Sequence, residues 1–461
     1  MLYQLVPDKL SLYSLALRYS KASVIKISDF KSKKFLLLQL PLAVFLSWFL
    51  PHAHGEEEGL VLHNAIERSL QHHPSLQVFT LRDQALSASL SRAKMRPALG
   101  LDLSAENFAG SGELSGVDGA EFTIALSSVL EMGGKRQARI GTVASRKALL
   151  QTEQQVQALA LLGNITRLFI DGLAAQERLK LAQQVHQQAL KTLGDLKLRA
   201  KAGAAPAAEV LRARSAAAQA ELSYLNEQQQ LNYLRHAMAA FWLERKPKFE
   251  VFKGDLYHFD DDVDFDTLFQ GVKNNPSMLV LAANERLSEA KLRLAKTQSR
   301  IDMQWSVGLR QLQESSDTAL VAQISVPLFA DKRNQYNIAQ TQSQYQQDQI
   351  AKELALLNIH TQLYRAFNLR QQAIERTRRL QQVIIPALTE ALAATELAYQ
   401  RGRYRYLDYV GALQELQQAQ RALIDSASSA LHYGAEIEQL TTAPLSQGFY
   451  PINNQTEGAE S

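Results

Sequence analysis

Hydrophobic and polar residues alternate along four short segments of this chain. In one of them, Phe122, Ile124 and Leu126 alternate with small or polar residues. The same period of two recurs over residues 99–108, 303–310 and 320–328. This period predicts β-strands that have one apolar face and one polar face. At roughly 9 to 11 residues each, such strands also have a length that suits a membrane-crossing strand.

A helical pattern follows the second and the fourth of these segments. We predict two long helices, over 137–201 and over about 335–399, from apolar residues spaced three and four positions apart. A helix of about 65 residues would be roughly 95–100 Å long. Each helix is broken by a glycine, Gly203 or Gly402. Because the connections are short, a second helix should return antiparallel in each case. These returning helices are predicted over 207–243 and 406–440.

The second half of the chain repeats the order of elements in the first half. Each half begins with a predicted helix, over 60–97 or 266–300, that carries an internal proline, Pro74 or Pro276. The offset between corresponding positions is about 200 residues, too long for a solenoid repeat. We therefore predict two structural repeats behind a leader, with an irregular connector between them and a flexible tail. The predicted boundaries are leader 1–55, first repeat 56–243, connector 244–265, second repeat 266–440 and tail 441–461.

Four strands are too few for a protein that crosses a membrane alone. Open sheet edges in lipid leave backbone groups without partners, at several kcal/mol each, and a closed barrel needs more strands. The pattern therefore predicts a mainly α protein whose copies pool their strands into one barrel. The helical hairpins are rich in alanine and would pack against neighbouring copies. The alternative is a soluble helical scaffold with two half-buried β-hairpins, since alternation suits that sheet equally well.

Composition fits an oxidising compartment outside the cytoplasm and excludes several kinds of chemistry. The chain has no cysteine, which excludes disulfides, thiolate metal sites and cysteine nucleophiles. Its net charge of +4 comes from residues 1–54, which hold seven basic residues and two acidic ones. Nucleic-acid binding therefore gains no support. Residues 31–55 are typical of a cleavable signal peptide, with lysines before an apolar run and Ala53-His54-Gly55 after it. A membrane anchor is the alternative.

Catalytic and metal-binding motifs do not stand out. We find no nucleophile elbow, phosphate loop or metal motif, so we predict no enzyme, no cofactor and no catalytic residue. His52 and His54 belong to the leader, and His72 and His73 flank a proline without acids at ligand spacing. We therefore predict no metal site.

Two motifs connect this arrangement with a known family. The helix 62–76 contains LHNAIER followed by HPSL, and residues 130–136 read LEMGGKR. Together with the order of elements, which covers roughly residues 60–440, these motifs resemble the TolC family of outer-membrane efflux ducts. The LEMGGKR segment is similar to the CzcC-like branch, the outer-membrane partners of heavy-metal exporters.

The resemblance implies a homotrimer in the bacterial outer membrane, with a twelve-stranded β-barrel continued by a periplasmic helical barrel. Such ducts catalyse nothing and dock on a periplasmic membrane-fusion adaptor and an inner-membrane pump, often of the resistance-nodulation-division (RND) type. Heavy-metal cations are the implied cargo, and drugs or secreted polypeptides are the alternative.

The resemblance also assigns roles to the two hairpin tips, which form the periplasmic entrance and the adaptor contact in the family. In both tips an acidic residue follows a glycine by six positions, and Asp408 matches a position that forms an acidic ring in some members. In one family pattern a second acid follows three positions later, but this chain has Gly411 there. This difference weakens the hypothesis of an acidic gate. Tyr404 and Tyr406 could narrow or latch the aperture instead. The predicted tip residues are Gly203, Glu209, Val210, Gly402, Tyr404, Tyr406, Leu407 and Asp408.

Simpler roles are open for these tip residues. A glycine near a helical turn commonly caps the helix, and an acid just inside the next helix commonly complements its N-terminal dipole.

A second group of residues lies where each strand becomes a helix, close to the predicted inner rim of the membrane. For its basic pairs we prefer anchoring at the lipid interface as the explanation. The predicted rim residues are Gly133, Gly134, Lys135, Arg136, Lys332 and Arg333.

Overall fold

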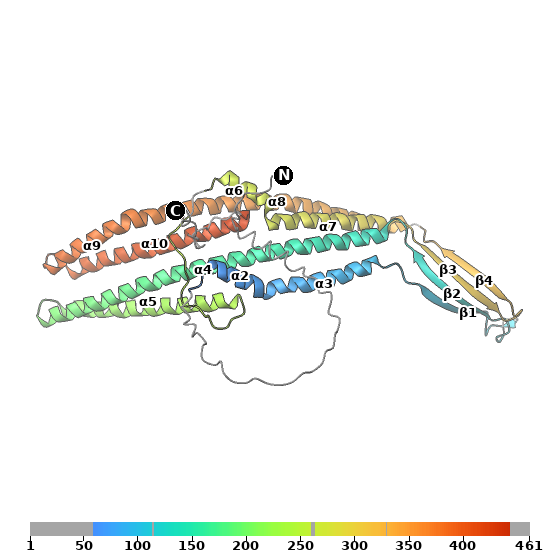
Figure 1. The fold of residues 1–461 in the computed structure, drawn as a ribbon, viewed down its shortest axis with the longest axis horizontal. Coiled ribbons are helices and arrows are strands. Elements are labelled where there is room, and N and C mark those ends of the chain that lie inside the picture. The colour runs from blue at the N-terminus through green and yellow to red at the C-terminus, as the bar shows by residue number, and fades with distance from the viewer. Residues whose placement is uncertain (1–58, 113–114, 260–262, 329, 443–461) are drawn as a thin grey trace, which may run out of the picture. The chain divides into compact units, whose positions relative to one another are not determined.

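The computed structural model describes residues 59–112, 115–259, 263–328 and 330–442 (Figure 1). The predicted leader and most of the predicted tail lie outside these residues. The chain forms two compact units. The sheet unit comprises Ser75–Val156 and Pro276–Asn358, and the hairpin unit comprises the described residues of Met1–Pro74, Gln157–Asn275 and Ile359–Ser461.

The sheet unit contains one antiparallel sheet of four strands in the order β1-β2-β3-β4. The strands are β1 (Gly100–Glu106), β2 (Glu121–Leu130), β3 (Met303–Leu312) and β4 (Thr318–Ser325). Both repeats therefore contribute to the same sheet, through the pairing of β2 with β3. The register places Ile124 beside Leu103 on one side and beside Leu309 on the other. The predicted alternation is thus aligned across the strands.

The two faces of this sheet differ sharply in chemistry. The apolar face is exposed, and its side chains include Leu103 at 69% and Leu320 at 75% relative exposure. On the opposite face, Arg310 donates to Glu121 Oε2 at 2.7 Å and to Thr123 Oγ1 at 3.0 Å. An exposed apolar band of this kind is costly in water and stable against lipid.

Each β-hairpin of the sheet unit is preceded by one helix and followed by another. α3 (Pro74–Lys94) and α7 (Pro276–Gln298) precede the two β-hairpins, and α4 (Lys135–Lys201) and α8 (Ala330–Arg379) follow them. A small core joins α4 to α7, where Leu149 packs against Ala283 and Leu287. The prediction of a single helix over 60–97, interrupted at His73-Pro74, needs a correction, because α2 (Leu62–His72) ends before His73 and α3 begins at Pro74.

The hairpin unit contains two long helical hairpins. The first pairs α4 with α5 (Ala207–Ala240), and the second pairs α9 (Ile385–Gln400) with α10 (Tyr406–Thr441) (Figure 1). The helix predicted over 335–399 is not continuous, because a π-helical turn, Leu380–Ile384, separates α8 from α9. Pro386 follows that turn and lacks the N–H that would continue the α-helical ladder. Its ring would also crowd the carbonyl four residues earlier.

The predicted connector, 244–265, supplies part of the core of the hairpin unit. Phe252 is 1% exposed, and its backbone N–H and carbonyl both bind the side-chain amide of Gln176 in α4. Leu60 pairs with Phe252 in a parallel β-bridge. The Phe252 ring lies where a side chain on Gly172 would stand. The connector has little regular structure, but it is anchored on α4.

The second repeat enters the hairpin unit through α6 (Phe265–Gly271) and a 3-10 turn, Val272–Asn274. Asn275 is buried and donates from Nδ2 to the carbonyls of Gln439 and Leu440, at 2.7 and 2.8 Å. These carbonyls belong to the last turn of α10, where intrahelical donors are lacking. The Asn275-Pro276 pair therefore ends one helix, caps another and begins α7.

Among the described residues, α4 is the one helix long and apolar enough to cross a membrane. Its most apolar window is 72% buried inside the protein. This burial is typical of a core helix.

Candidate functional site: the hairpin tips and the strand-to-helix joints

Both hairpin tips turn on a glycine in the left-handed region. Gly203 has φ +74° and Gly402 has φ +70°. In the first tip the N–H of Ala204 donates to Arg199 O at 2.8 Å, and in the second the N–H of Arg403 donates to Ala398 O at 2.9 Å. Such contacts satisfy backbone carbonyls at a helix end. At the position of either glycine, a residue with a Cβ would have a strained backbone. The tip glycines therefore cap α4 and α9.

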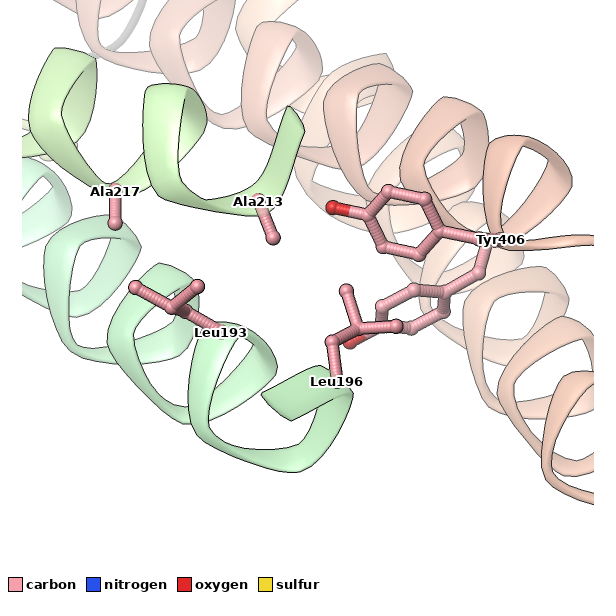
Figure 2. Packing of buried hydrophobic residues seen from close by; sticks show 6 residues of the cluster. Leu193, Leu196, Ala213, Ala217 and Tyr406 are labelled. Carbon is pink, nitrogen blue, oxygen red and sulfur yellow. The ribbon is translucent and has the colours of Figure 1, made fainter. Parts of the chain in front are cut away.

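The two tips pack against each other through a small apolar cluster. Leu193 and Leu196 of α4 and Ala213 and Ala217 of α5 meet Tyr406 of α10 (Figure 2). Tyr406 is 4% exposed. Val210, a predicted tip residue, is partly buried against the same cluster. The small alanine side chains on α5 leave room for the tyrosine ring.

A second set of contacts joins the hairpins through aromatic and cationic groups. The Tyr399 ring stacks on Tyr409 at a centroid distance of 5.6 Å and an interplanar angle of 10°. The Arg199 guanidinium lies 4.7 Å from the centroid of Tyr399. Gln188 Nε2 donates to the Tyr409 hydroxyl oxygen at 2.9 Å. We call these four residues, with Tyr406, the tyrosine latch.

Burial raises the pKa of Tyr399 and of Tyr406 above the usual tyrosine value. The nearby Glu209 carboxylate acts in the same direction on both groups. Both phenols are therefore neutral at physiological pH, and they can stack and donate hydrogen bonds.

The structure separates the predicted tip residues into two groups. Tyr406 and Val210 lie at the contact between hairpins, whereas Tyr404 and Leu407 are about half exposed. Sequence reasoning missed Tyr399, Tyr409, Arg199 and Gln188. The spacing of Tyr406 and Tyr409 on one helical face was a signal for Tyr409. No comparable pattern pointed to Arg199 and Gln188, because their role depends on how two hairpins meet.

Asp408 binds its own helix. Its Oδ2 accepts from the backbone N–H of Arg405 at 2.9 Å, and the Arg405 Nε lies 3.8 Å away. A carboxylate here also complements the positive end of the helix dipole. The geometry is that of a cap on α10.

The first strand-to-helix joint is a compact polar cluster around the predicted rim residues. Gly133 and Gly134 have φ values of +70° and +78°, and a Cβ on Gly133 would overlap the Arg300 side chain. Lys135 Nζ donates to Asp302 Oδ2 at 2.7 Å, and the N–H of Met132 donates to Asp302 Oδ1 at 3.2 Å. Asp302 immediately precedes β3, so this contact connects the two repeats.

The remaining cations of this joint also bind protein groups. Arg136 Nε donates to Lys94 O, at the end of α3, at 2.8 Å. Arg139 forms a two-point ion pair with Glu131. Lys135 is 12% exposed at its side chain. Lys135 Nζ and Arg136 Nε thus have partners within the protein, and anchoring of this basic pair at the lipid interface stays a prediction.

The second joint is built differently. Lys332 is exposed, and the side chain of Arg333 lies outside those that the structure describes. Asn334 Nδ2 donates to Ala295 O, near the end of α7. Asn334 thus caps α7 in the way that Arg136 caps α3.

The histidines have local roles in the described chain. His73 packs against the Phe241 ring at 5.9 Å, and burial lowers its pKa. His72 binds the backbone carbonyl of Arg68. The described residues contain no group of three or more side chains that could hold a metal ion.

The hairpin unit also contains a half-open groove of about 440 Å³ between α4, α5 and α10. Its walls are formed mainly by alanine and glutamine side chains, with Tyr406 and Tyr409 among its lining residues. The groove is therefore adjacent to the tyrosine latch.

Comparison with known proteins shows that this chain is similar to outer membrane efflux proteins. Residues 65–240 match the family model described as "Outer membrane efflux protein". The chain is 26% identical over 300 residues to the "Cobalt-zinc-cadmium resistance protein CzcC" of Cupriavidus metallidurans. That alignment covers 64% of this chain and 71% of CzcC.

Two solved outer-membrane proteins share the fold. The outer membrane protein VceC of Vibrio cholerae gives a TM-score of 0.67 at 20% identity, covering 83% of this chain and 96% of VceC. The CmeC outer membrane channel of Campylobacter jejuni gives 0.69 at 13% identity, covering 89% and 95%.

The fold and these matches define an efflux channel of the bacterial outer membrane. This chain is similar to outer membrane efflux proteins over residues 65–240, and it shares the fold of the outer-membrane proteins VceC and CmeC.

Proposed function

We propose that this chain forms a homotrimeric duct that passively conducts heavy-metal cations from an inner-membrane pump and a periplasmic adaptor to the exterior. The sheet carries the proposal. Its apolar face is exposed, and its outer edges, on β1 and β4, lack a partner strand among the described residues. Unpaired backbone groups in lipid cost several kcal/mol each, so other copies must supply the missing strands.

The flanking helices support the same assembly. α8 follows the edge strand β4 and exposes Ile350, Leu354 and Leu357, while α3 precedes the edge strand β1 and exposes Val78 and Leu81. A ring in which β4 of one copy pairs with β1 of the next would bring these apolar residues together. Three copies would supply twelve strands, a number compatible with a closed outer-membrane barrel.

Three predicted properties of the purified protein test the duct. It should require detergent, migrate as a heat-modifiable trimer, and conduct ions in planar bilayers. A protein that is soluble and monomeric without detergent would instead be a periplasmic scaffold. Absence of conductance in bilayers, even for variants with disrupted tips, would contradict the duct.

The cargo proposal depends on the similarity to CzcC and on the LEMGGKR segment. We assign the selection of cargo to an RND-type pump, and the duct needs no catalytic step. Deletion of the gene should sensitise cells to cobalt, zinc or cadmium, with nickel, copper and a drug panel measured in parallel. Sensitivity to drugs without sensitivity to metals would contradict the cargo and would favour a duct for drugs or polypeptides.

We further propose that the hairpin tips close the periplasmic entrance and contact the adaptor. The tyrosine latch holds one hairpin against the other, so it is suited to keep a closed state. The exposed Tyr404 and Leu407 are suited to contact a partner. Variants at these two groups should separate the roles, since latch variants should raise conductance and exposed-residue variants should weaken adaptor binding.

A further inference from the structure

The end of the sheet that joins the helices carries a strong excess of positive charge. Three segments lie at this end, residues 92–99, 130–139 and 293–302, where α3, α4 and α7 meet the sheet (Figure 1). Together they contain nine cationic side chains and two acidic ones. We call these three segments the basic belt.

The three segments of the basic belt touch one another. Arg136, at the start of α4, binds the carbonyl of Lys94 at the end of α3. The N–H of Met132 binds the carboxylate of Asp302, which precedes β3. The belt is therefore one continuous feature of the sheet unit, although its parts are far apart in sequence.

The two acidic residues of the belt are both used within it. Asp302 pairs with Lys135, and Glu131 pairs with Arg139. Arg293 pairs with a glutamate one turn earlier on α7. The remaining cations are exposed and form no salt bridge within the described chain: Arg92, Lys94, Arg96, Arg136, Lys296 and Arg300.

Exposed apolar side chains lie among these cations. Met95, Met132 and Ile301 are exposed within the belt, and Leu99 and Leu130 extend the apolar faces of β1 and β2 into it. Lysine and arginine can lay their carbon stems along an apolar surface while their charged ends reach a polar layer. The belt therefore continues the exposed apolar face of the sheet and borders it with positive charge.

The opposite end of the sheet has the opposite charge. Residues 106–121 and 310–318 contain six acidic side chains and one cationic side chain, Arg310. Arg310 is paired with Glu121 and Glu106. An anionic molecule is therefore attracted to the end of the sheet that joins the helices and repelled from the other end.

We propose that the basic belt binds the anionic headgroups of acidic phospholipids in the membrane leaflet nearest the helices. This inference rests on the proposed function, because it requires the apolar face of the sheet to lie in lipid. Arginine can bind phosphate oxygens at two points, and lysine binds them as a compact charge. An anionic membrane surface attracts basic side chains that lie beside it.

The position of the belt favours lipid over a protein partner. Its cations border an apolar face that extends from it along the sheet, which is the order of chemistry met on passing from headgroups to acyl chains. Anionic headgroups would also reduce the repulsion among six exposed like charges. Acidic lipid would therefore hold the sheet at a defined depth in the membrane.

The test measures binding of two fluorescent lipids to the full chain in an uncharged detergent. The lipids are phosphatidylglycerol and phosphatidylcholine with identical acyl chains. Phosphatidylglycerol should bind at least about fivefold more tightly, and this preference should shrink as salt is raised. Equal binding of the two lipids would overturn the inference.

A triple variant locates the preference in the belt. Arg92→Gln, Arg96→Gln and Lys296→Gln together remove three exposed charges and keep polar side chains. This variant should bind phosphatidylglycerol about tenfold or more weakly and phosphatidylcholine within about twofold of the unaltered chain. An unchanged preference for phosphatidylglycerol would contradict the role of the belt.

A matched control removes the same number of exposed charges elsewhere. Arg365→Gln, Arg376→Gln and Arg378→Gln lie on the part of α8 that belongs to the hairpin unit. Binding of phosphatidylglycerol should stay within about twofold. Equal losses in the two triple variants would overturn the inference, because net charge rather than the belt would then set the affinity.

Two other partners for these cations are distinguished by the same assay. Inorganic phosphate, compared with sodium chloride at equal ionic strength, should not displace the labelled lipid. Displacement by phosphate alone would assign the belt to a free anion and overturn the lipid. If acids of a neighbouring copy pair with the belt, the unaltered chain should show no preference for phosphatidylglycerol and the triple variant should dissociate. That result would also overturn the inference.

Conductance in planar bilayers, recorded on the same preparations, separates this inference from the proposed duct. A conducting protein without preference for phosphatidylglycerol would overturn the lipid inference alone. A preference for phosphatidylglycerol without conductance would overturn the proposed duct alone.

Discussion

The two strand-to-helix joints occupy equivalent places in the two repeats but use different chemistry. The first holds its turn with an ion pair from the other repeat, Lys135 to Asp302. In the second, the amide of Asn334 binds the carbonyl of Ala295. In both, a side chain early in the long helix caps the helix that precedes the sheet. The comparison teaches that the repeats share a backbone path while their side-chain contacts have diverged.

The largest expected effect is a difference in unfolding free energy between variants of the two joints. Asp302→Ala removes the partner of a largely buried Lys135 and the acceptor for the N–H of Met132. Breaking a buried ion pair is costly; because Asp302 is partly exposed, we expect a loss of about 2–3 kcal/mol of unfolding free energy. Asn334→Ala removes two neutral, partly exposed hydrogen bonds, one to the carbonyl of Ala295 and one from the amide of Asn337, and should cost about 1 kcal/mol. Equal losses, measured by heat-modifiability or denaturant unfolding, would contradict the difference between the joints.

A second comparison is confined to the first joint. Gly133→Ala meets both a positive φ and the Arg300 side chain, whereas Gly134→Ala meets a positive φ with open space around it. A residue with a Cβ in the left-handed region costs about 1–2 kcal/mol. Both variants should therefore lose stability, and Gly133→Ala should lose more. Denaturant unfolding of the two variants side by side measures the difference, and a larger loss for Gly134→Ala would show that Arg300 moves aside freely.

The tyrosine latch provides a comparison between two aromatic residues of the second hairpin. Tyr399→Ala removes the stack on Tyr409 and the contact with Arg199, which together are worth about 1–2 kcal/mol. If the latch favours a closed tip, single-channel conductance or open probability in bilayers should rise. The exposed Tyr404→Ala is the control and should leave conductance unchanged. If conductance rose in Tyr404→Ala but not in Tyr399→Ala, Tyr404 rather than Tyr399 would hold the tip closed.

The smallest expected effect is a pH dependence of the same latch. The pKa values of Tyr399 and Tyr406 are raised in the folded protein, so their neutral forms are favoured by folding. This stability is complete below the ordinary tyrosine pKa of 10.0 and is lost as pH rises through the raised values. Bilayer conductance should therefore be constant from pH 7 to about 9 and rise above about pH 10.

A conservative variant isolates the contribution of one phenol to that rise. Tyr399→Phe keeps the stack and the cation–π contact but cannot ionise. It should reduce the increase in conductance at high pH. An unchanged alkaline response in this variant would assign the response to other groups.

The sequence predicted the elements of this protein well because their signals are local. Alternation along 122–126 identified β2, and glycines placed both hairpin tips. The π-helical turn before Pro386 was missed, and His73-Pro74 was predicted to interrupt one helix rather than to separate two, because helical periodicity is insensitive to one displaced residue. The connector was predicted to be irregular, and sequence gave no reason to expect that Phe252 would be held by Gln176 in the core.

The candidate site was predicted only in part. Tyr406 and Val210 were named from their position beside a tip, and both lie at the contact between hairpins. Arg199, Gln188, Tyr399 and Tyr409 became part of the site only when two hairpins, about 200 residues apart in sequence, were brought together. The basic pair Lys135-Arg136 was predicted to lie at the lipid interface, and its protein partners, Asp302 and the end of α3, could not be predicted from the sequence.

By itself, the sequence determined the order of strands and long helices, the apolar and polar faces of the sheet, and the turns. These depend on periodicity and on glycine, which act within a few residues. Only the tertiary structure decided which charges are paired and which are free. Lys135 Nζ binds Asp302 and Arg136 Nε binds the carbonyl of Lys94, while Arg401 and Arg403 are exposed. The physical reason is that the behaviour of a charge depends on its nearest opposite charge and on its burial, and both are set by packing between distant segments.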